Sequence, residues 1–457
     1  MIKSIKHYLI SVFLFYCLTT IVLYILLSQY IPHEGLIIIQ ILLSISYFLI
    51  LFINFNKYKP HPYLIKFKEK KMNLLPLYIF IYQITLSLLL RELFLSVYDH
   101  PFGFNPADSL RYHDLAIKSR YLSFSELFHF LKNQNLNIDD YGFPIIQYAI
   151  YSVVNTEHGA LILSLFTNSL AITISAIVFL KLSEKLLPQK IAYLGAIILG
   201  FSPFAVFASV SNLKENYLIL FVILAFYYLY KFLQKPGFLK ILLFGIFTAI
   251  VFLFRYSVAY MLIICFATGI IASLKNIRKL IPLLAVIIVI CCILFIDSIF
   301  ALITTDVNIG YWLEVKLDRV DSHMVGIIVN LISTTVGPLP NFLLDADSNQ
   351  SMLMYNSFVL LKIFISYFYL IGIWLIIKNK EYKLYPILTF VFLHSIMIFV
   401  TFFSMHLRFQ WPQIPAFLII SGYGFYNFNK EGHRSKYSKI YVLVSVMLII
   451  VFNFRFA

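Results

Sequence analysis

Charged side chains are scarce in this sequence. Asp, Glu, Lys and Arg together make up 12% of the 457 residues, whereas hydrophobic residues make up 61%. A soluble domain of this length could not cover its surface with so few polar side chains. The low content of charged residues excludes an ordinary soluble protein and indicates a membrane protein that is largely surrounded by lipid.

Cysteine is rarer still, and the positions of the four cysteines exclude a cysteine metal site and a disulfide. Cys17, Cys265, Cys291 and Cys292 all lie in apolar segments. They lack the spacing of metal ligands, and no cysteine stands in a polar loop where a disulfide would form. We therefore interpret all of them as packing residues.

Long apolar runs, by contrast, recur along the whole chain. Each is roughly twenty residues long, enough to cross a hydrocarbon core about 30 Å thick as a helix. The sequence predicts an all-α, polytopic transmembrane bundle of about thirteen spans. No small-residue cleavage site follows the first run, which we interpret as a retained anchor. The expected spans are 8–29, 35–54, 73–97, 158–180, 191–210, 216–233, 238–254, 256–273, 280–300, 351–377, 384–403, 410–427 and 439–455.

The net charge of +15 is spread over short loops instead of forming one patch, which argues against a nucleic-acid partner. With the spans above, every basic cluster falls in a loop on the same side of the membrane. Because Lys and Arg concentrate in cytoplasmic loops, the sequence predicts a cytoplasmic N-terminus. The clusters lie at positions 3–6, 57–71, 181–190, 231–240, 275–279, 378–383 and 430–439.

Two long polar segments fall on the opposite, extracytoplasmic side, at about 98–157 and 301–350. Acidic residues outnumber basic ones in the first of them. The positive-inside rule does not require an acidic outer loop, so its carboxylates are free to serve chemistry. We expect both loops to contain short interfacial helices, and we expect the function to reside on this side.

Each long outer loop contains one stretch that predicts a short helix. The stretch 109–120 is opened by Asp108, which is either the N-cap of that helix or a general base at the membrane surface. The stretch 324–336 is too short to span the membrane and ends at Gly337-Pro338. It predicts an interfacial or re-entrant segment under the active site.

Three outer-face cations, Lys214, Arg255 and Arg408, are exceptions to the positive-inside bias. They are either membrane-interface anchors or ligands that converge from three helix ends on one anionic group. Glu215 is either the ion-pair partner of Lys214 or a hydrogen-bond acceptor for a ligand.

Other ionisable residues fall inside the expected spans. Arg91 and Glu92 lie in the outer part of the third span. There the two residues either have a function or form an ion pair with each other and have no other role. We interpret His394 as a buried, hydrogen-bonded histidine and Lys362 as a lysine that snorkels to the interface.

The order of these features resembles the GT-C superfamily of membrane glycosyltransferases that use polyprenyl-phosphate sugars. The branch it resembles contains the protein O-mannosyltransferases and the lipid A aminoarabinose transferase. The resemblance extends from about residue 74 onward. The motifs that carry it are Asp108-Ser-Leu-Arg-Tyr-His113, Tyr141-Gly-Phe-Pro144, Ser202-Pro203, Lys214-Glu215, Gly337-Pro338-Leu339-Pro340, and Arg408-Phe409 with Pro412 and Pro415.

The resemblance implies a division of the chain and a set of roles. Residues 1–72 would form two additional N-terminal transmembrane helices, and residues 73–457 a GT-C-like catalytic domain that lacks the large soluble C-terminal domain of some branches. Asp108 would be the catalytic base. The residues expected to bind substrate are Tyr112, His113, Asp140, Tyr141, Lys214, Glu215, Arg255 and Arg408.

Within that set, the cations would bind the donor phosphate, and Tyr112 and Tyr141 are placed to stack on sugar rings. His113 is a candidate ligand for the phosphate or for a divalent cation. No second ligand stands at metal-site spacing, so we predict no metal site.

Together these features predict an inverting transfer of a hexose or pentose from polyprenyl phosphate to an extracytoplasmic glycan or lipid-linked acceptor. The expected location is the cytoplasmic (inner) membrane of a bacterium. An O-antigen-type polymerase remains an alternative, and it would depend more on Arg255 and Arg408. A flippase or transporter of lipid-linked saccharides would require ionisable residues deep in several spans, which are few here.

Overall fold

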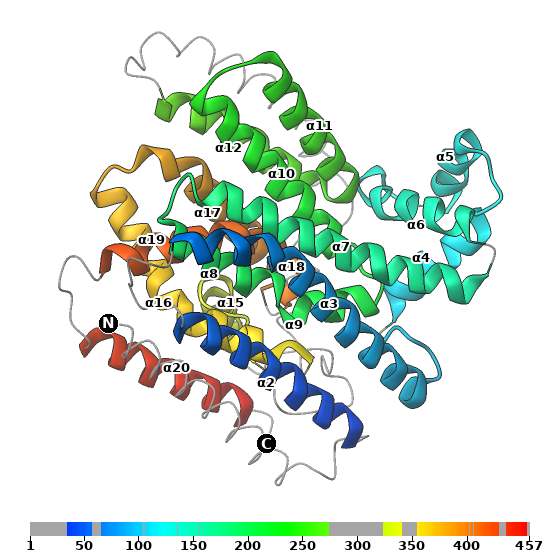
Figure 1. Ribbon diagram of the computed structural model, residues 1–457, viewed down its shortest axis with the longest axis horizontal. Helices are drawn as coiled ribbons and strands as arrows, with labels where there is room; N and C mark the ends of the chain where they lie inside the picture. Colours follow the sequence, from blue (N-terminus) through cyan, green and yellow to red (C-terminus); the bar gives the residue numbers. More distant parts are fainter. Residues whose placement is uncertain are drawn as a thin grey trace.

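The computed structural model describes residues 34–56, 65–103, 106–134, 136–154, 156–273, 323–340, 354–401, 403–404, 406–428 and 436–454. Every regular element in these ranges is a helix (Figure 1). In chain order they are α2 (Glu34–Asn56), α3 (Ile65–Tyr98), α4 (Ala107–Ser119), α5 (Phe124–Asn133), η3 (Ile138–Asp140), α6 (Gly142–Val153), α7 (Glu157–Ser183), α8 (Gln189–Gly200), α9 (Pro203–Val210), α10 (Glu215–Gln234), α11 (Phe238–Phe254), α12 (Tyr256–Ser273), α15 (His323–Thr335), α16 (Asn356–Lys378), η6 (Tyr382–Leu384), α17 (Tyr385–Val400), α18 (Leu407–Gln410), η7 (Trp411–Gln413), α19 (Ile414–Phe428) and α20 (Lys436–Phe454).

Seven helical segments of the described chain are long and apolar enough to cross a membrane: Leu74–Tyr98, Glu157–Ser183, Gln189–Val210, Glu215–Gln234, Tyr256–Ser273, Asn356–Lys378 and Tyr382–Val400. The all-α membrane bundle expected from the sequence is therefore confirmed. Its exact number of spans stays a prediction, since the expected spans 8–29 and 280–300 lie outside the described residues. Cys17, Cys291 and Cys292 lie outside them too, whereas Cys265 is a buried free cysteine, as expected.

Glycine residues allow close contact between helices of the bundle. In lipid the hydrophobic effect does not favour helix association, so close packing of small residues is what holds membrane helices together. Among the described helices, α16 and α19 make the largest contact with each other. A Cβ atom added at Gly372 of α16 would meet the backbone of Ile420, and one at Gly424 of α19 would meet the backbone of Phe368. This crossing fixes the C-terminal helices, which carry the segment that contains Arg408.

The expected span 191–210 is not one continuous helix. Helix α8 ends at Gly200, and α9 starts at Pro203, the favoured residue type for a first helical position. The break leaves the Gly200 carbonyl free to accept a hydrogen bond of 2.7 Å from Gln83 Nε2 of α3. The sequence motif Ser202-Pro203 therefore marks an interruption inside this expected span.

The first of the two long segments expected on the outer side folds into the short helices α4, α5, η3 and α6, a lobe that projects from one side of the bundle (Figure 1). Helix α5 starts with a capping box in which Ser123 and Glu126 bond to each other's backbone amides. Leu127 and Leu131 of α5 pack against Tyr141 in a small core of this lobe. The lobe is thus an ordered structure, and it presents α4 and η3 to the helix ends of the bundle.

The segment 324–336, expected to be interfacial or re-entrant, forms the thirteen-residue helix α15. It packs against α17 and ends before Gly337. Ser366 of α16 donates a 3.1 Å hydrogen bond to the Val336 carbonyl. Helix α15 is therefore tied to two of the C-terminal helices.

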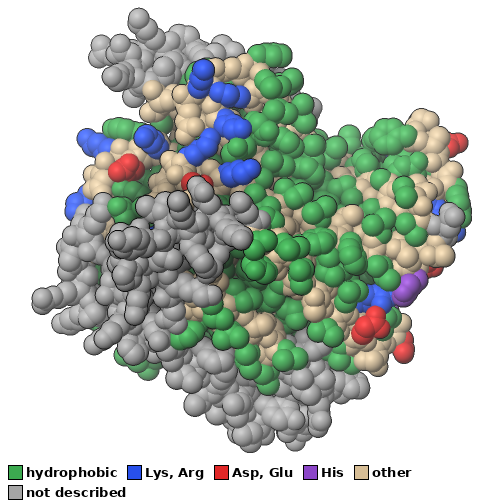
Figure 2. Space-filling view, viewed as in Figure 1, with side chains coloured by type: hydrophobic (Ala, Val, Ile, Leu, Met, Phe, Trp, Pro, Cys, Tyr) green, Lys and Arg blue, Asp and Glu red, His purple; other side chains and the backbone are tan. Residues whose placement is uncertain are grey.

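Three of the basic clusters meet at the C-terminal end of α10. Lys185 Nζ donates to Gln234 Oε1 at 3.1 Å, and the Tyr230 hydroxyl donates to the Lys383 carbonyl at 2.7 Å. Figure 2 shows a group of Lys and Arg side chains at the upper left, apart from the hydrophobic surface of the bundle. The other end of α10 begins at Glu215, at the polar pocket described next.

Candidate active site

A polar pocket of about 250 Å³ lies where the lobe formed by α4, α5, η3 and α6 meets the ends of the bundle helices. Its walls come from segments that are far apart in the sequence: α4, η3, the residue before α10, the junction between α11 and α12, and α18. The lining residues are Asp108, Arg111, Tyr112, Leu136, Asp139, Asp140, Lys214, Phe254, Arg255, Arg408 and Phe409.

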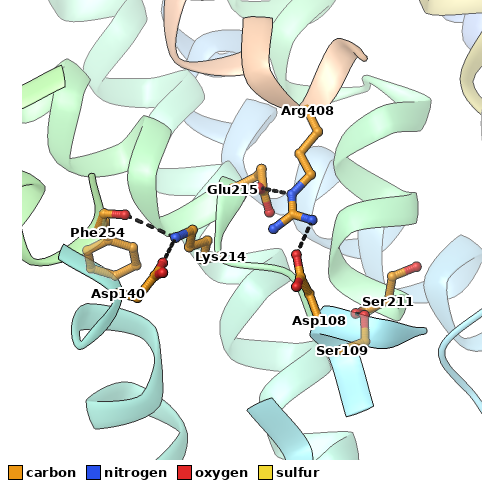
Figure 3. Close-up of polar contacts among 8 residues, drawn as sticks. All are labelled: Asp108, Ser109, Asp140, Ser211, Lys214, Glu215, Phe254 and Arg408. Atoms are coloured by element: carbon orange, nitrogen blue, oxygen red, sulfur yellow. Dashed lines mark hydrogen bonds and ion pairs between the residues drawn. The ribbon is translucent and has the colours of Figure 1, made fainter. Parts of the chain in front are cut away.

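Asp108 is the second residue of α4 and points into this pocket (Figure 3). The residue at the N-cap position is Pro106, and no side chain caps the helix, so the alternative that Asp108 is an N-cap is wrong. Its Oδ2 atom instead accepts a 2.5 Å contact from Nη1 of Arg408. The Ser109 hydroxyl donates to the Ser211 carbonyl and fastens the first turn of α4 next to the start of α10.

Arg408 joins two carboxylates (Figure 3). Its Nε donates to Glu215 Oε1 at 2.5 Å, while Nη1 contacts Asp108. Burial opposes the charged form of Arg408, but Glu215 and Asp108 outweigh it and raise the pKa of the guanidinium. Glu215 is fully buried, and its Oε2 has no hydrogen-bond partner among the described residues. The expectation that Glu215 pairs with Lys214 is therefore wrong, because Glu215 pairs with Arg408. That Glu215 accepts a hydrogen bond from a ligand stays a prediction.

Lys214, the neighbouring cation, pairs with a different carboxylate. Its Nζ donates to Asp140 Oδ1 and, at 3.1 Å, to the Phe254 carbonyl at the end of α11. A Cβ atom at Gly142 would collide with the Phe254 ring, so glycine at this position allows η3 and α6 to approach α11. Burial and the nearby Arg255 lower the pKa of Lys214, whereas Asp140 opposes that shift.

Arg255 is the single non-helical residue between α11 and α12. Its guanidinium carbon lies 5.1 Å from the centre of the Phe409 ring, in cation–π contact. Its buried Nη1 atom has no hydrogen-bond partner in the described part of the chain. A buried donor without an acceptor is costly, which makes this atom a candidate ligand for an anion in the pocket.

Two lining residues, Arg111 and Asp139, were not among the expected site residues. Arg111 is one turn after Asp108, so its place on the pocket side could have been found from helical spacing. Asp139 precedes Asp140 in η3, and burial and the Asp140 carboxylate raise the pKa of Asp139. No pattern in the sequence separates Asp139 from the other acids of its loop.

Tyr112 lines the pocket as expected, with its ring 5.0 Å from that of Phe143. Tyr112 is buried, and this burial raises the pKa of its hydroxyl. Tyr141, by contrast, does not line the pocket. It is buried in the core of the lobe beside Leu115, so the expectation that it stacks on a sugar is not met by this structure.

His113 lies on α4 but is turned away from the pocket. Its Nδ1 atom bonds to the Tyr151 hydroxyl at 2.6 Å, and its Nε2 atom bonds to Glu157 Oε1 at 2.7 Å. Both ring nitrogens are therefore occupied, which removes His113 as a phosphate ligand in this arrangement. In the part of the chain that the structure describes, no three His, Cys, Asp or Glu residues are grouped as metal ligands.

The ionisable residues inside spans have local partners. Arg91 forms an ion pair with Glu92 and contacts His158 Nδ1 at 3.1 Å, while its buried Nε has no hydrogen-bond partner among the described residues. His394 is buried and bonded to Gln413 Oε1 at 3.2 Å. Lys362 does not snorkel, because its side chain is 6% exposed and bonded inside the bundle.

The fold and the site define a helical membrane protein with a charged pocket at one end of its bundle. Residues 144–296 match the family model of the dolichyl-phosphate-mannose-protein mannosyltransferases, and this match supports a GT-C superfamily glycosyltransferase. The matched stretch includes Lys214, Glu215 and Arg255 but neither Asp108 nor Arg408. None of the curated proteins compared with the chain matches it.

Proposed function

We propose that this protein is an inverting glycosyltransferase that moves one sugar from a polyprenyl-phosphate donor to a hydroxyl of an extracytoplasmic glycan or lipid-linked acceptor. The observation that carries the proposal is the convergence of Asp108 with Lys214, Arg255 and Arg408 on one pocket. A carboxylate beside several cations suits a reaction that removes a proton and releases a phosphate. The family match supports the same class of donor.

In the proposed reaction the acceptor oxygen attacks the anomeric carbon while the bond from that carbon to the phosphate oxygen breaks. Asp108 takes the proton of the acceptor hydroxyl. The electron pair of the broken bond leaves with the polyprenyl phosphate, whose negative charge the cations of the pocket stabilise. Attack from the face opposite the leaving group inverts the anomeric configuration.

Arg255 is the cation best suited to bind the donor phosphate. Lys214 and Arg408 already have carboxylate partners, whereas Nη1 of Arg255 is buried without a hydrogen-bond partner in the described residues. A phosphate oxygen would supply the missing acceptor, and charge-assisted bonds of this kind are the stronger ones.

The ion pairs of Arg408 would link binding of the donor phosphate to release of the proposed base, Asp108. Nη1 of Arg408 contacts Asp108, while Nε contacts the buried Glu215. A phosphate that takes over the Nη1 contact frees the Asp108 carboxylate for the acceptor hydroxyl. Glu215 keeps the guanidinium in place during this exchange.

The test is sugar transfer by the full-length protein in lipid nanodiscs, with polyprenyl-phosphate mannose as the first donor probe and a panel of polyprenyl-phosphate hexoses and pentoses after it. Asp108→Asn should lower kcat by at least about 100-fold, the scale of general-base catalysis. Asp114→Asn is the matched control, since Asp114 is an exposed acid of the same helix and does not line the pocket. Undiminished transfer by a folded Asp108→Asn protein would contradict the proposal.

Product analysis separates this function from the polymerase alternative. A transferase adds one sugar to each acceptor, so the product runs as a single new band. A ladder of lengthening products that survives Asp108→Asn and disappears with Arg255→Gln would favour a polymerase.

A further inference from the structure

Lys362 has an unusual environment for a lysine in a membrane span. It lies in the second turn of α16, and 6% of its surface is exposed. Its Nζ donates to the Gly337 carbonyl and, at 2.7 Å, to Gln410 Oε1, and it lies 5.2 Å from the centre of the Phe417 ring. No carboxylate pairs with it among the described residues. Burying an unpaired ammonium is costly, so these carbonyl contacts need a reason beyond packing.

Gln410 extends the contact into a buried network. Its Nε2 donates to the carbonyls of Ser333 at 2.9 Å and Ser404 at 2.6 Å. The Ser404 hydroxyl donates to Asn330 Oδ1 at 2.5 Å, and Asn330 Nδ2 donates to the Phe399 carbonyl at 2.8 Å. The network therefore joins α15, α16, the end of α17 and α18.

The network ends next to the pocket. Gln410 is the last residue of α18, a helix of four residues that also contains Arg408. Helix α18 continues through the 3-10 turn η7 into α19, so its C-terminal end is held by the chain itself and by side-chain contacts. Lys362 and Gln410 supply side-chain bonds at that end, two residues from Arg408.

We propose that Lys362 is a positioning residue that acts through Gln410 and α18 to direct Arg408 toward Asp108 and Glu215. Lys362 does not line the pocket, so it does not touch the donor. The inference rests on the proposed function, because it assigns Lys362 to the arginine that contacts the base. A displacement of about 1 Å at such a residue is enough to lower a rate by about 100-fold.

The test is a double-mutant cycle on the full-length protein, with kcat and the donor KM measured for Lys362→Met, Arg408→Lys and the double variant. If Lys362 acts through Arg408, Lys362→Met should lower kcat by at least about 10-fold alone and should add little in the Arg408→Lys background. Effects that multiply would overturn the inference, and so would a fully active Lys362→Met protein.

A matched control and a second variant keep the test decisive. Gln83→Leu removes another buried glutamine that donates to a backbone carbonyl, outside the Lys362–Gln410 network, and should leave transfer within about threefold of wild type. If Lys362→Met fails to fold, Gln410→Glu replaces it in the cycle. That variant keeps an acceptor for Lys362 but loses both donations from Nε2, so it should again lower kcat non-additively with Arg408→Lys.

The outcomes distinguish this inference from the proposed function. Arg408→Lys with wild-type kinetics would contradict the proposed role of the pocket itself. Impaired Arg408→Lys together with multiplicative Lys362→Met would contradict only the positioning role.

Discussion

Helix α4 carries two polar clusters on different faces, and they differ in how completely they are bonded. On the face with His113, both ring nitrogens have partners, Tyr151 and Glu157. On the face with Asp108, the cluster keeps two buried atoms without partners in the described structure, Nη1 of Arg255 and Oε2 of Glu215. Buried polar atoms that lack partners and lie beside a pocket are candidates for contacts with a ligand.

The two clusters also differ in charge. The pocket brings Arg111, Lys214, Arg255 and Arg408 against three aspartates, so its potential depends on which charges are paired. The His113 cluster holds one carboxylate, and that carboxylate is more than half exposed. Substitutions of the paired pocket residues should therefore change both chemistry and stability, whereas substitutions around His113 should change stability alone.

The largest effect is expected for Arg408→Ala. It strips the fully buried Glu215 of its partner, and removing one member of a buried pair costs about 3–5 kcal/mol. The yield of folded protein and its thermal midpoint should both fall. Arg408→Ala combined with Glu215→Ala should recover much of the stability but none of the transfer activity. An Arg408→Ala protein as stable as wild type would contradict the expectation that the pocket depends on its ion pairs more than the His113 cluster does.

A smaller effect, and one confined to stability, is expected for His113→Gln. Glutamine can replace one of the two hydrogen bonds, and losing the other costs about 0.5–1.5 kcal/mol. The thermal midpoint should fall while kcat stays within about threefold of wild type. A tenfold loss of transfer at unchanged stability would place His113 in the catalytic machinery after all.

The smallest effect is expected for Asp139→Asn and depends on pH. Burial and Asp140 raise the pKa of Asp139 in the folded protein, so folding disfavours its charged form. The wild-type protein should therefore lose stability as the pH rises from the ordinary aspartate pKa, about 3.9, through the raised pKa of Asp139 in the folded state.

Asp139→Asn removes that loss, because asparagine stays neutral throughout. At pH 7 its thermal midpoint should exceed that of wild type by an amount worth less than about 1 kcal/mol, since Asp139 is partly exposed. Below about pH 4 the two midpoints should coincide. A constant difference across the whole pH range would show that the titration of Asp139 is not its cause.

The sequence was sufficient for the helices and for part of the site. Hydropathy is a local property, so each expected span within the described residues overlaps a helix. Asp108, Tyr112, Asp140, Lys214, Arg255 and Arg408 were singled out as polar residues in outer segments, and the structure brings these six to one pocket. Their catalytic and binding roles stay predictions.

The expectations that failed concern the direction and partners of side chains. His113 and Tyr141 belong to the right segments but turn into other clusters. Lys362 was expected to reach the interface, yet Gln410 and the Gly337 carbonyl hold it inside. A helical pattern gives the face of a residue but not what packs against that face, so these contacts lay beyond the sequence.

The sequence by itself determined that this protein is a bundle of membrane helices with its unusual charges in a few polar segments between them, because apolar length and charge placement act locally along the chain. Only the tertiary structure decided which charges meet. Asp108 and Arg408 are 300 residues apart in the chain, and Glu215 and Arg408 are 193 apart. Contacts at such separations follow from how helices pack and where they break, and no local pattern encodes them.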